Sequence, residues 1–194
     1  MSTAFTKLIS RVSSSVLSLE EAKSHLRILG TAQDTLVSTC LNAAVQWAET
    51  RTERVLSQTT YQLRIEPMDG TLVLPFPDFK EITKIETISG GTKAEVYNAE
   101  GPVGTLSDYV EVDDFPNPAE LTFTTANLDE DVDYLLLTLT FQMTVIPEDL
   151  KAAIKLLLGH LFQNSSEVVT GTIASQMPLG AETILSMHTF KRYG

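Results

Sequence analysis

The chain has 194 residues, of which 43% are hydrophobic, so it is long and apolar enough for one large domain or one domain with an insertion. Its formal net charge is −11, which argues against a protein that grips nucleic acid through clustered Lys and Arg. Cys40 is the single cysteine, which excludes an internal disulfide and a cysteine-rich zinc site.

No segment reaches the roughly 18 uninterrupted apolar residues of a membrane span. The N-terminal residues also lack the long apolar run of a signal peptide. We therefore expect a soluble protein that is made in a reducing cytoplasm.

The chain opens with residues of weak pattern and continues into two helices. We expect residues 1–17 to be a loose arm or an edge strand. Ser18 and Glu21 have the spacing of a capping box, so a first helix begins there, and Gly30 suits its end. Its apolar stripe is Leu19, Ala22, Leu26 and Leu29. A second helix with a broad apolar face is expected over about residues 32–54.

The hydrophobic period changes to two at Thr59, where Tyr61, Leu63 and Ile65 alternate with polar residues. Such alternation is typical of a half-buried strand. Further strands are expected at residues 71–74, 82–89, 96–97, 109–112, 121–123 and 134–141. In the last of these, Leu135, Leu137, Leu139 and Phe141 face one way. Residues 59–145 are therefore expected to form a mainly antiparallel β region.

Two short motifs punctuate this β region. Gly90-Gly91 predicts a tight hairpin turn. Phe76 lies between Pro75 and Pro77, and two alternatives stay open for it. An exposed Pro-Phe-Pro loop can dock to a partner, or it can close the end of a β sandwich.

A third helix is expected to begin at Pro147, because the missing N–H of proline needs no partner at a helix start. The helix is apolar almost all round, so it must be covered on most sides. We expect the first two helices to cover one side and neighbouring subunits to cover the rest. The residues assigned to such a ring interface are Leu150, Ile154, Leu157, Leu158, Leu161 and Phe162.

Residues 164–194 follow as a polar arm with too little apolar mass to build a core. Such an arm is expected to order only against a partner, at about 1–2 kcal/mol of backbone entropy per fixed residue. The predicted fold class is α+β: a small α-helical bundle with an inserted antiparallel β domain and an extended C-terminal arm. The predicted divisions are an N-terminal arm (1–17), the bundle (18–56 and 147–163), the β domain (59–145) and the partner-binding arm (164–194).

The sequence predicts no chemistry. His25, His160 and His188 lack metal-ligand spacing, and Cys40 falls on the apolar face of the second helix. The acidic run 129–133 lacks the glycine and the distal glutamate of an EF-hand loop, which favours a solvated loop over a calcium site. G-x-S-x-G, P-loop and dinucleotide motifs are absent. We predict no catalytic residue, metal or cofactor, and a protein that is not an enzyme.

The order of these pieces resembles the phage head–tail connector (adaptor) family of long-tailed phages and gene transfer agents. The segment Ser18–Leu26 resembles the opening helix of that family, and Leu74–Pro77 followed by Ile82–Ile85 resembles its inserted β segment. The sequence from Val145 through the third helix resembles its closing helix. Met177–Leu179, Leu185 and Phe190–Tyr193 resemble its C-terminal arm.

The resemblance implies a structural virion protein at the capsid–tail junction. Members of the family form a dodecameric ring beneath the portal, extend the DNA channel and present a surface to the tail or its stopper protein. Their C-terminal arm inserts into the portal. If the arm of this chain acts in the same way, the resemblance implies these portal-binding residues: Met177, Pro178, Leu179, Leu185, Phe190, Lys191, Arg192 and Tyr193.

The acidic composition adds the hypothesis that DNA passes through the lumen without specific binding, because acid on a channel wall repels phosphate within a Debye length of about 8 Å. Three alternatives stay open. They are a tail-completion or terminator ring protein, a receptor- or carbohydrate-binding module with exposed aromatics on one sheet face, and a hydrolase that uses Asp or Glu.

Overall fold

The structure is a computed structural model, and it describes residues 5–101, 103–115, 117–129, 131–165 and 178–191. The fold is mixed α+β, as the sequence predicts. The chain divides into two compact units. The β unit comprises residues 1–11 and 59–144, and the helical unit comprises residues 12–58 and 145–194.

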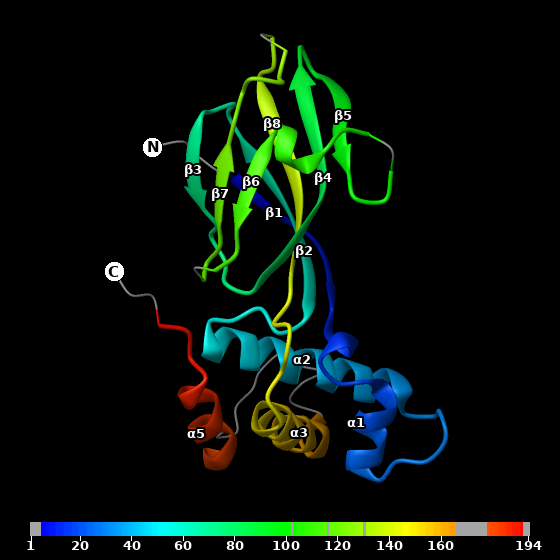
Figure 1. Ribbon diagram of the computed structural model, residues 1–194. Coiled ribbons are helices and arrows are strands. Elements are labelled where there is room, and N and C mark those ends of the chain that lie inside the picture. Colours follow the sequence, from blue (N-terminus) through cyan, green and yellow to red (C-terminus); the bar gives the residue numbers. More distant parts are fainter. Residues whose placement is uncertain (1–4, 102, 116, 130, 166–177, 192–194) are drawn as a thin grey trace. The chain divides into compact units, whose positions relative to one another are not determined.

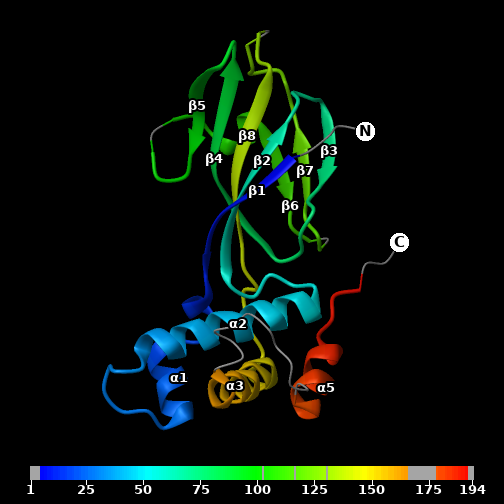
Figure 2. The ribbon, with the colours of Figure 1, turned by 180° about the vertical axis from the view of Figure 1, so that it is seen from behind.

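The β unit contains two antiparallel sheets (Figure 1). The larger sheet has the strand order β1 (Phe5–Val12), β2 (Gln58–Ile65), β8 (Tyr134–Phe141), β4 (Phe79–Ser89) and β5 (Thr92–Asn98). The smaller sheet has the order β3 (Gly70–Val73), β7 (Glu120–Phe123) and β6 (Val110–Asp113). Seen from both sides, the smaller sheet lies over one face of the larger one (Figures 1 and 2). A short 3-10 helix, η2 (Leu106–Asp108), precedes β6.

The strand β8 is the centre of the larger sheet, and this position buries more of it than the sequence predicts. In register, Leu137 lies opposite both Leu63 on β2 and Ile85 on β4, and all three are buried. Leu136 and Thr140, on the other face of β8, are buried as well. Burial of residues on both faces of β8 means that both faces are covered there, so the strict alternation of a half-buried strand is lost.

The hairpin between β4 and β5 confirms the turn expected at Gly90-Gly91. Both glycines have positive φ angles, 56° and 82°, which is the conformation that a two-residue hairpin turn of this kind requires. The carboxylate of Asp133 accepts a 2.8 Å hydrogen bond from the Gly90 N–H. The end of the acidic run therefore anchors this turn.

The Pro-Phe-Pro segment closes one end of the larger sheet. The ring of Phe76 stacks on Tyr61 with centroids 4.4 Å apart and meets Phe141 edge-on at 5.8 Å. Phe79 also meets Phe141 edge-on at 5.8 Å. Because Phe76 is engaged within this cluster, the structure favours the closing role over the docking role.

The helical unit contains η1 (Ser13–Ser15), α1 (Leu19–Leu26), α2 (Asp34–Thr52), α3 (Glu148–Gln163) and α5 (Leu179–Met187). Both views show α3 between α1 and α5, and all three helices contact α2 (Figures 1 and 2). The capping box at the start of α1 is confirmed. Glu21 N–H donates to Ser18 Oγ at 3.2 Å, and Ser18 N–H donates to the Glu21 carboxylate at 2.9 Å.

The first helix ends at Leu26, earlier than the sequence predicts. Arg27 takes the left-handed conformation (φ 57°), and its N–H closes the last turn on the carbonyl of Ser24 at 3.2 Å. The chain then leaves the helix axis, so Leu29 is exposed. Its predicted place in the apolar stripe is wrong for this reason.

A buried carboxylate organises the end of α2. The Oε1 atom of Glu49 accepts hydrogen bonds from Leu56 N–H (3.0 Å), Ser57 N–H (2.7 Å) and Ser57 Oγ–H (2.6 Å). These bonds hold the segment after Glu53, where the chain reverses with φ 54°. Charge-assisted bonds of this kind are about twice as strong as neutral ones.

Candidate interaction surfaces

The C-terminal segment folds back onto its own helical unit over residues 178–191. The helix α5 packs against α3 and α2, and its side chains Ala181 and Leu185 are fully buried there. The expectation of an arm that orders only against a partner is therefore wrong for this segment. The two buried residues lie four apart, so they occupy one face of a short helix and supply the contact that the arm was expected to lack.

Polar contacts fix the same segment at both ends of α5. The Arg51 guanidinium lies 2.6 Å from the Glu182 carboxylate. At the other end, His188 Nε2 lies 2.8 Å from Asp149 Oδ2, in the first turn of α3. This hydrogen bond from His188 holds the pKa of the Asp149 carboxyl below its usual range.

The residues after α5 continue along the end of α2. The Phe190 N–H donates to the Thr52 carbonyl at 2.7 Å, and Thr189 Oγ–H donates to the Arg51 carbonyl at 3.3 Å. The guanidinium of Arg54 lies 5.8 Å from the centroid of the Phe190 ring. The chain is thus held to the helical unit up to residue 190.

The structure separates the predicted portal-binding residues into three groups. Met177, Arg192 and Tyr193 lie outside the described residues. Leu185 is buried in the helical unit, so it has no surface to offer a partner. Four remain accessible: Leu179 and Lys191 are exposed, and Pro178 and Phe190 are half-buried.

The residues assigned to a ring interface are mostly core residues of this chain. Leu150, Ile154, Leu157, Leu158 and Leu161 are all buried, and Phe162 is half-buried. That assignment is wrong for the five buried residues. The predicted bundle does not include α5. In the structure α5 packs on α3 and covers part of the apolar surface of α3 that neighbouring subunits are expected to cover.

Several exposed apolar side chains do remain, and sequence periodicity singles out none of them. In the helical unit, Met187 at the end of α5 is 67% exposed and Leu156 on α3 is 45% exposed. In the β unit, Phe115 is 96% exposed in the segment between β6 and β7. Exposed apolar residues are common singly, so they mark a surface only where other features agree.

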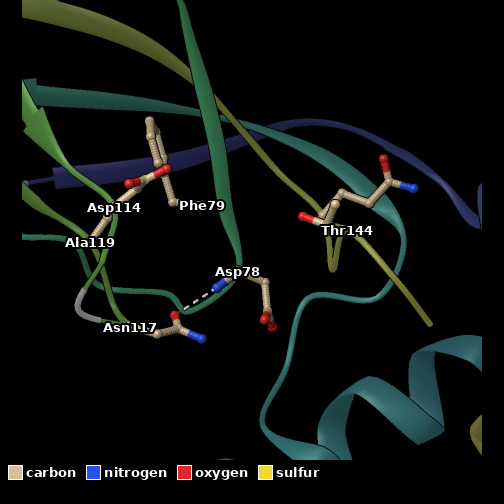
Figure 3. Close-up of a pocket in the computed structure, with 7 residues that line it drawn as sticks. Asp78, Phe79, Asp114, Asn117, Ala119 and Thr144 are labelled. Carbon is tan, nitrogen blue, oxygen red and sulfur yellow. Dashed lines mark hydrogen bonds between the residues drawn. The ribbon is translucent and has the colours of Figure 1, made fainter. Parts of the chain in front are cut away.

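A polar hollow of about 220 Å³ lies at one end of the β unit (Figure 3). The Asn117 side-chain oxygen accepts from Asp78 N–H at 2.9 Å, and Gln142 N–H donates to the Asp78 carbonyl at 2.8 Å. Asp78 itself has φ 61°, so these bonds fix a strained turn. Ligand pockets are usually larger, about 300–1,000 Å³, and mainly apolar, so the hollow fits a structural junction.

Among the described residues, no group of three His, Cys, Asp or Glu side chains is arranged to hold a metal ion. Burial of Cys40 in α2 raises the pKa of its thiol, which lowers its nucleophilicity at neutral pH. The carboxylate of Asp69 receives Thr125 N–H at 2.7 Å, so this acid secures a turn. Within the described part of the chain, no helix has the length and apolarity to span a bilayer.

Comparison with known proteins confirms the resemblance seen in the sequence. The profile of the family described as "Phage gp6-like head-tail connector protein" matches residues 16–84, a little over a third of the chain. This match covers α1, α2, β2, β3 and the first part of β4. No curated protein matches the sequence.

Solved structures extend the likeness to the whole chain. The fold is similar to chains in "Neck of empty GTA particle computed with C6 symmetry" (TM-score 0.64), "Virion of native gene transfer agent (GTA) particle" (0.62) and "Neck of native GTA particle computed with C12 symmetry" (0.60). In each case the sequence identity is 18% and the match covers 97% of both chains. At this identity the likeness establishes the fold.

Proposed function

We propose that this chain is a head–tail connector: a structural virion subunit that forms a ring under the portal, extends the DNA channel and joins the capsid to the tail. One observation carries the proposal. A connector-family profile matches the first part of the chain, and chains from gene transfer agent necks share its fold from end to end. The likeness includes both units, so it is not limited to a common supersecondary motif.

The ring itself is supported by the particles in which similar chains are found. Those necks were computed with C6 and C12 symmetry, which are the symmetries of cyclic assemblies. A cyclic ring uses heterologous contacts, in which one patch of a subunit meets a different patch of the next. We propose the same closure for this chain, in the capsid–tail junction of a particle assembled inside a bacterial host.

The receptor- or carbohydrate-binding alternative gains no support from the structure. It requires exposed aromatics on one sheet face, for which the strand-region tyrosines Tyr61, Tyr97 and Tyr109 are too few. All three are half-buried, and Tyr61 is stacked under Phe76. The face of Tyr61 that stacks on Phe76 is therefore not available to a sugar.

For the portal contact we propose the outward surface of α5 with the residues that follow it. Ala181 and Leu185 hold the helix to the bundle, while Leu179 and Met187 stay exposed. Lys191 and the half-buried Phe190 continue this surface. A helix already fixed to a bundle loses less entropy on docking than a free arm does, which favours a tight contact.

Point variants on this surface test the portal contact better than deletion of the arm. Truncation after Gln163 removes Ala181 and Leu185 from the core as well as the exposed residues, so loss of binding would be ambiguous. We expect Leu179→Asp and Met187→Asp together to weaken attachment to the portal ring of the same particle at least tenfold. The matched control is Gln46→Asp on the exposed side of α2.

Co-sedimentation with the purified portal, followed by electron microscopy, measures this attachment. Retained attachment of the double variant removes α5 from the proposal but leaves the connector function. If the unmodified chain neither attaches to the portal nor forms a ring there, the connector function itself is wrong.

We also propose that DNA passes through the ring without specific binding. The net charge of −11 is the support, because each subunit adds acid to the assembly. A reconstruction of the ring resolves the side chains of the channel wall. A wall lined by Lys and Arg would contradict this part of the proposal.

A further inference from the structure

The strand β1 is bound to its own unit on one side only. It lies at the edge of the larger sheet next to β2, and all eight of its residues are exposed. Phe5, Leu8, Ile9 and Val12 are each between 45% and 61% exposed. Because side chains alternate along a strand, these apolar residues occupy both of its faces.

This strand carries little of the protection that isolated edges normally have. Sheet edges of monomeric proteins are commonly shielded by charged side chains, proline, a bulge, short length or a covering segment, and of these β1 has the charges of Lys7 and Arg11. The strand has eight residues without proline, and its apolar side chains stay open to solvent. Within its own unit the Arg64 guanidinium lies 6.0 Å from the centroid of the Phe5 ring, but all four apolar side chains keep 45% or more of their surface exposed.

The charge of β1 is opposite to that of the chain. Lys7 and Arg11 are the only charged side chains before Glu20, whereas the whole chain carries −11. A second copy of this chain is therefore an electrostatically favourable partner for β1. Complementary charge at an interface fixes its register and speeds encounter.

The β unit also carries a matching patch elsewhere. Asp113, the last residue of β6, forms an exposed tip with Asp114 and Phe115, and Phe115 is the most exposed large apolar side chain of the described residues. The Asp113 carboxylate accepts the Phe115 N–H at 3.0 Å, which orders the tip. An aromatic ring beside two acids complements a strand with apolar and basic side chains.

We propose that β1 of one copy binds the Asp113–Phe115 tip of the next copy, so that the two patches form a head-to-tail contact between subunits. The apolar side chains of β1 receive the ring of Phe115. Lys7 and Arg11 face Asp113 and Asp114. This inference rests on the proposed ring assembly and identifies the surface that builds it, in place of the buried leucines of α3.

The first test compares two exposed edge-strand residues. We expect Ile9→Asp to raise the concentration needed for ring assembly on the portal at least tenfold. Val73→Asp is the matched control, because Val73 lies on edge strand β3 with a similar exposed fraction, 55% against 50% for Ile9. Native mass spectrometry counts the copies, and circular dichroism melting checks that both variants fold.

The second test is a charge exchange. We expect Lys7→Glu to weaken ring assembly and the double variant Lys7→Glu with Asp114→Lys to restore it, because the exchanged pair keeps opposite charges. Recovery in the double variant supports the contact, since a merely structural defect in β1 would not be repaired from another loop. Assembly of Ile9→Asp equal to the control, or no recovery in the double variant, overturns it.

These outcomes separate the inference from the function it rests on. If the unmodified chain forms rings and Ile9→Asp does so equally well, β1 is excluded while the connector function stands. If the unmodified chain forms no ring with or without the portal, both are overturned.

Discussion

The most direct test of the observed fold is truncation of Leu185, the side chain that attaches α5 to the bundle. Leu185 is fully buried, so Leu185→Ala forfeits the whole transfer energy of three carbon atoms. At about 0.8 kcal/mol per buried CH2 group this is about 2.4 kcal/mol, and an unfilled cavity adds to it. Because α5 is a single short helix that can move into the cavity, we expect Leu185→Ala to lower the free energy of unfolding by about 2–3 kcal/mol.

The matched control is Leu179→Ala in the same helix. Leu179 is 84% exposed, so the same chemical change should alter stability by less than about 0.5 kcal/mol. Trp47 in α2 is the single tryptophan of the chain, and its fluorescence during urea unfolding reports on the helical unit. Hydrogen exchange of the α5 amides separates local release of the helix from unfolding of the whole unit.

The result that refutes the reasoning is equality of the two variants. If Leu185→Ala and Leu179→Ala both unfold like the unmodified chain, and the α5 amides exchange at unprotected rates in all three, the helix is not part of the core. The C-terminal segment would then be the free arm that composition alone suggests.

Two further predictions concern polar contacts of the helical unit. Glu49→Ala leaves the N–H groups of Leu56 and Ser57 without their acceptor. We expect this variant to lower the free energy of unfolding by at least about 3 kcal/mol in the same urea assay. Glu49→Gln should lower it less, because the amide oxygen of glutamine still accepts hydrogen bonds. The pKa of Asp149 is lowered by its bond to His188, so the folded-state pKa lies below the unfolded value of about 3.9. The stabilisation that the Asp149–His188 contact gives to the folded state is therefore present above the unfolded pKa and is lost as the pH falls through the folded pKa. We expect the difference in Tm between the unmodified chain and Asp149→Asn to stay constant well above about pH 3.9 and to shrink as the pH falls from about 3.9 through the folded pKa; a difference that stays constant down to acid pH would contradict the contact.

Local signals in the sequence located most of the helices and strands. The capping box at Ser18 and the glycine pair at 90–91 depend on a few neighbouring residues, and both appear as predicted. The strand β8 was predicted with its observed bounds, because its period of two is strong. The end of α1 is predicted too late, near Gly30, because the left-handed residue that ends the helix is Arg27 and not a glycine.

The candidate surfaces depended on contacts between distant segments, and there the sequence was a poor guide. A helix that is apolar all round must be covered, but periodicity does not say by what. The cover includes α5, whose two buried side chains, Ala181 and Leu185, lie 18 and 22 residues beyond Gln163, the last residue of α3. The leucines of α3 were therefore assigned to an interface although they belong to the core.

The sequence by itself determined the α+β class, the places where the chain turns from helix to strand and back, and the likeness to connector proteins, because these follow from patterns of adjacent residues. Only the tertiary structure decided which apolar side chains are core and which are surface. It buried Leu185 and the stripe of α3 and left β1 and Phe115 exposed. Burial is a property of all the segments that meet at one place, and no window of sequence contains them.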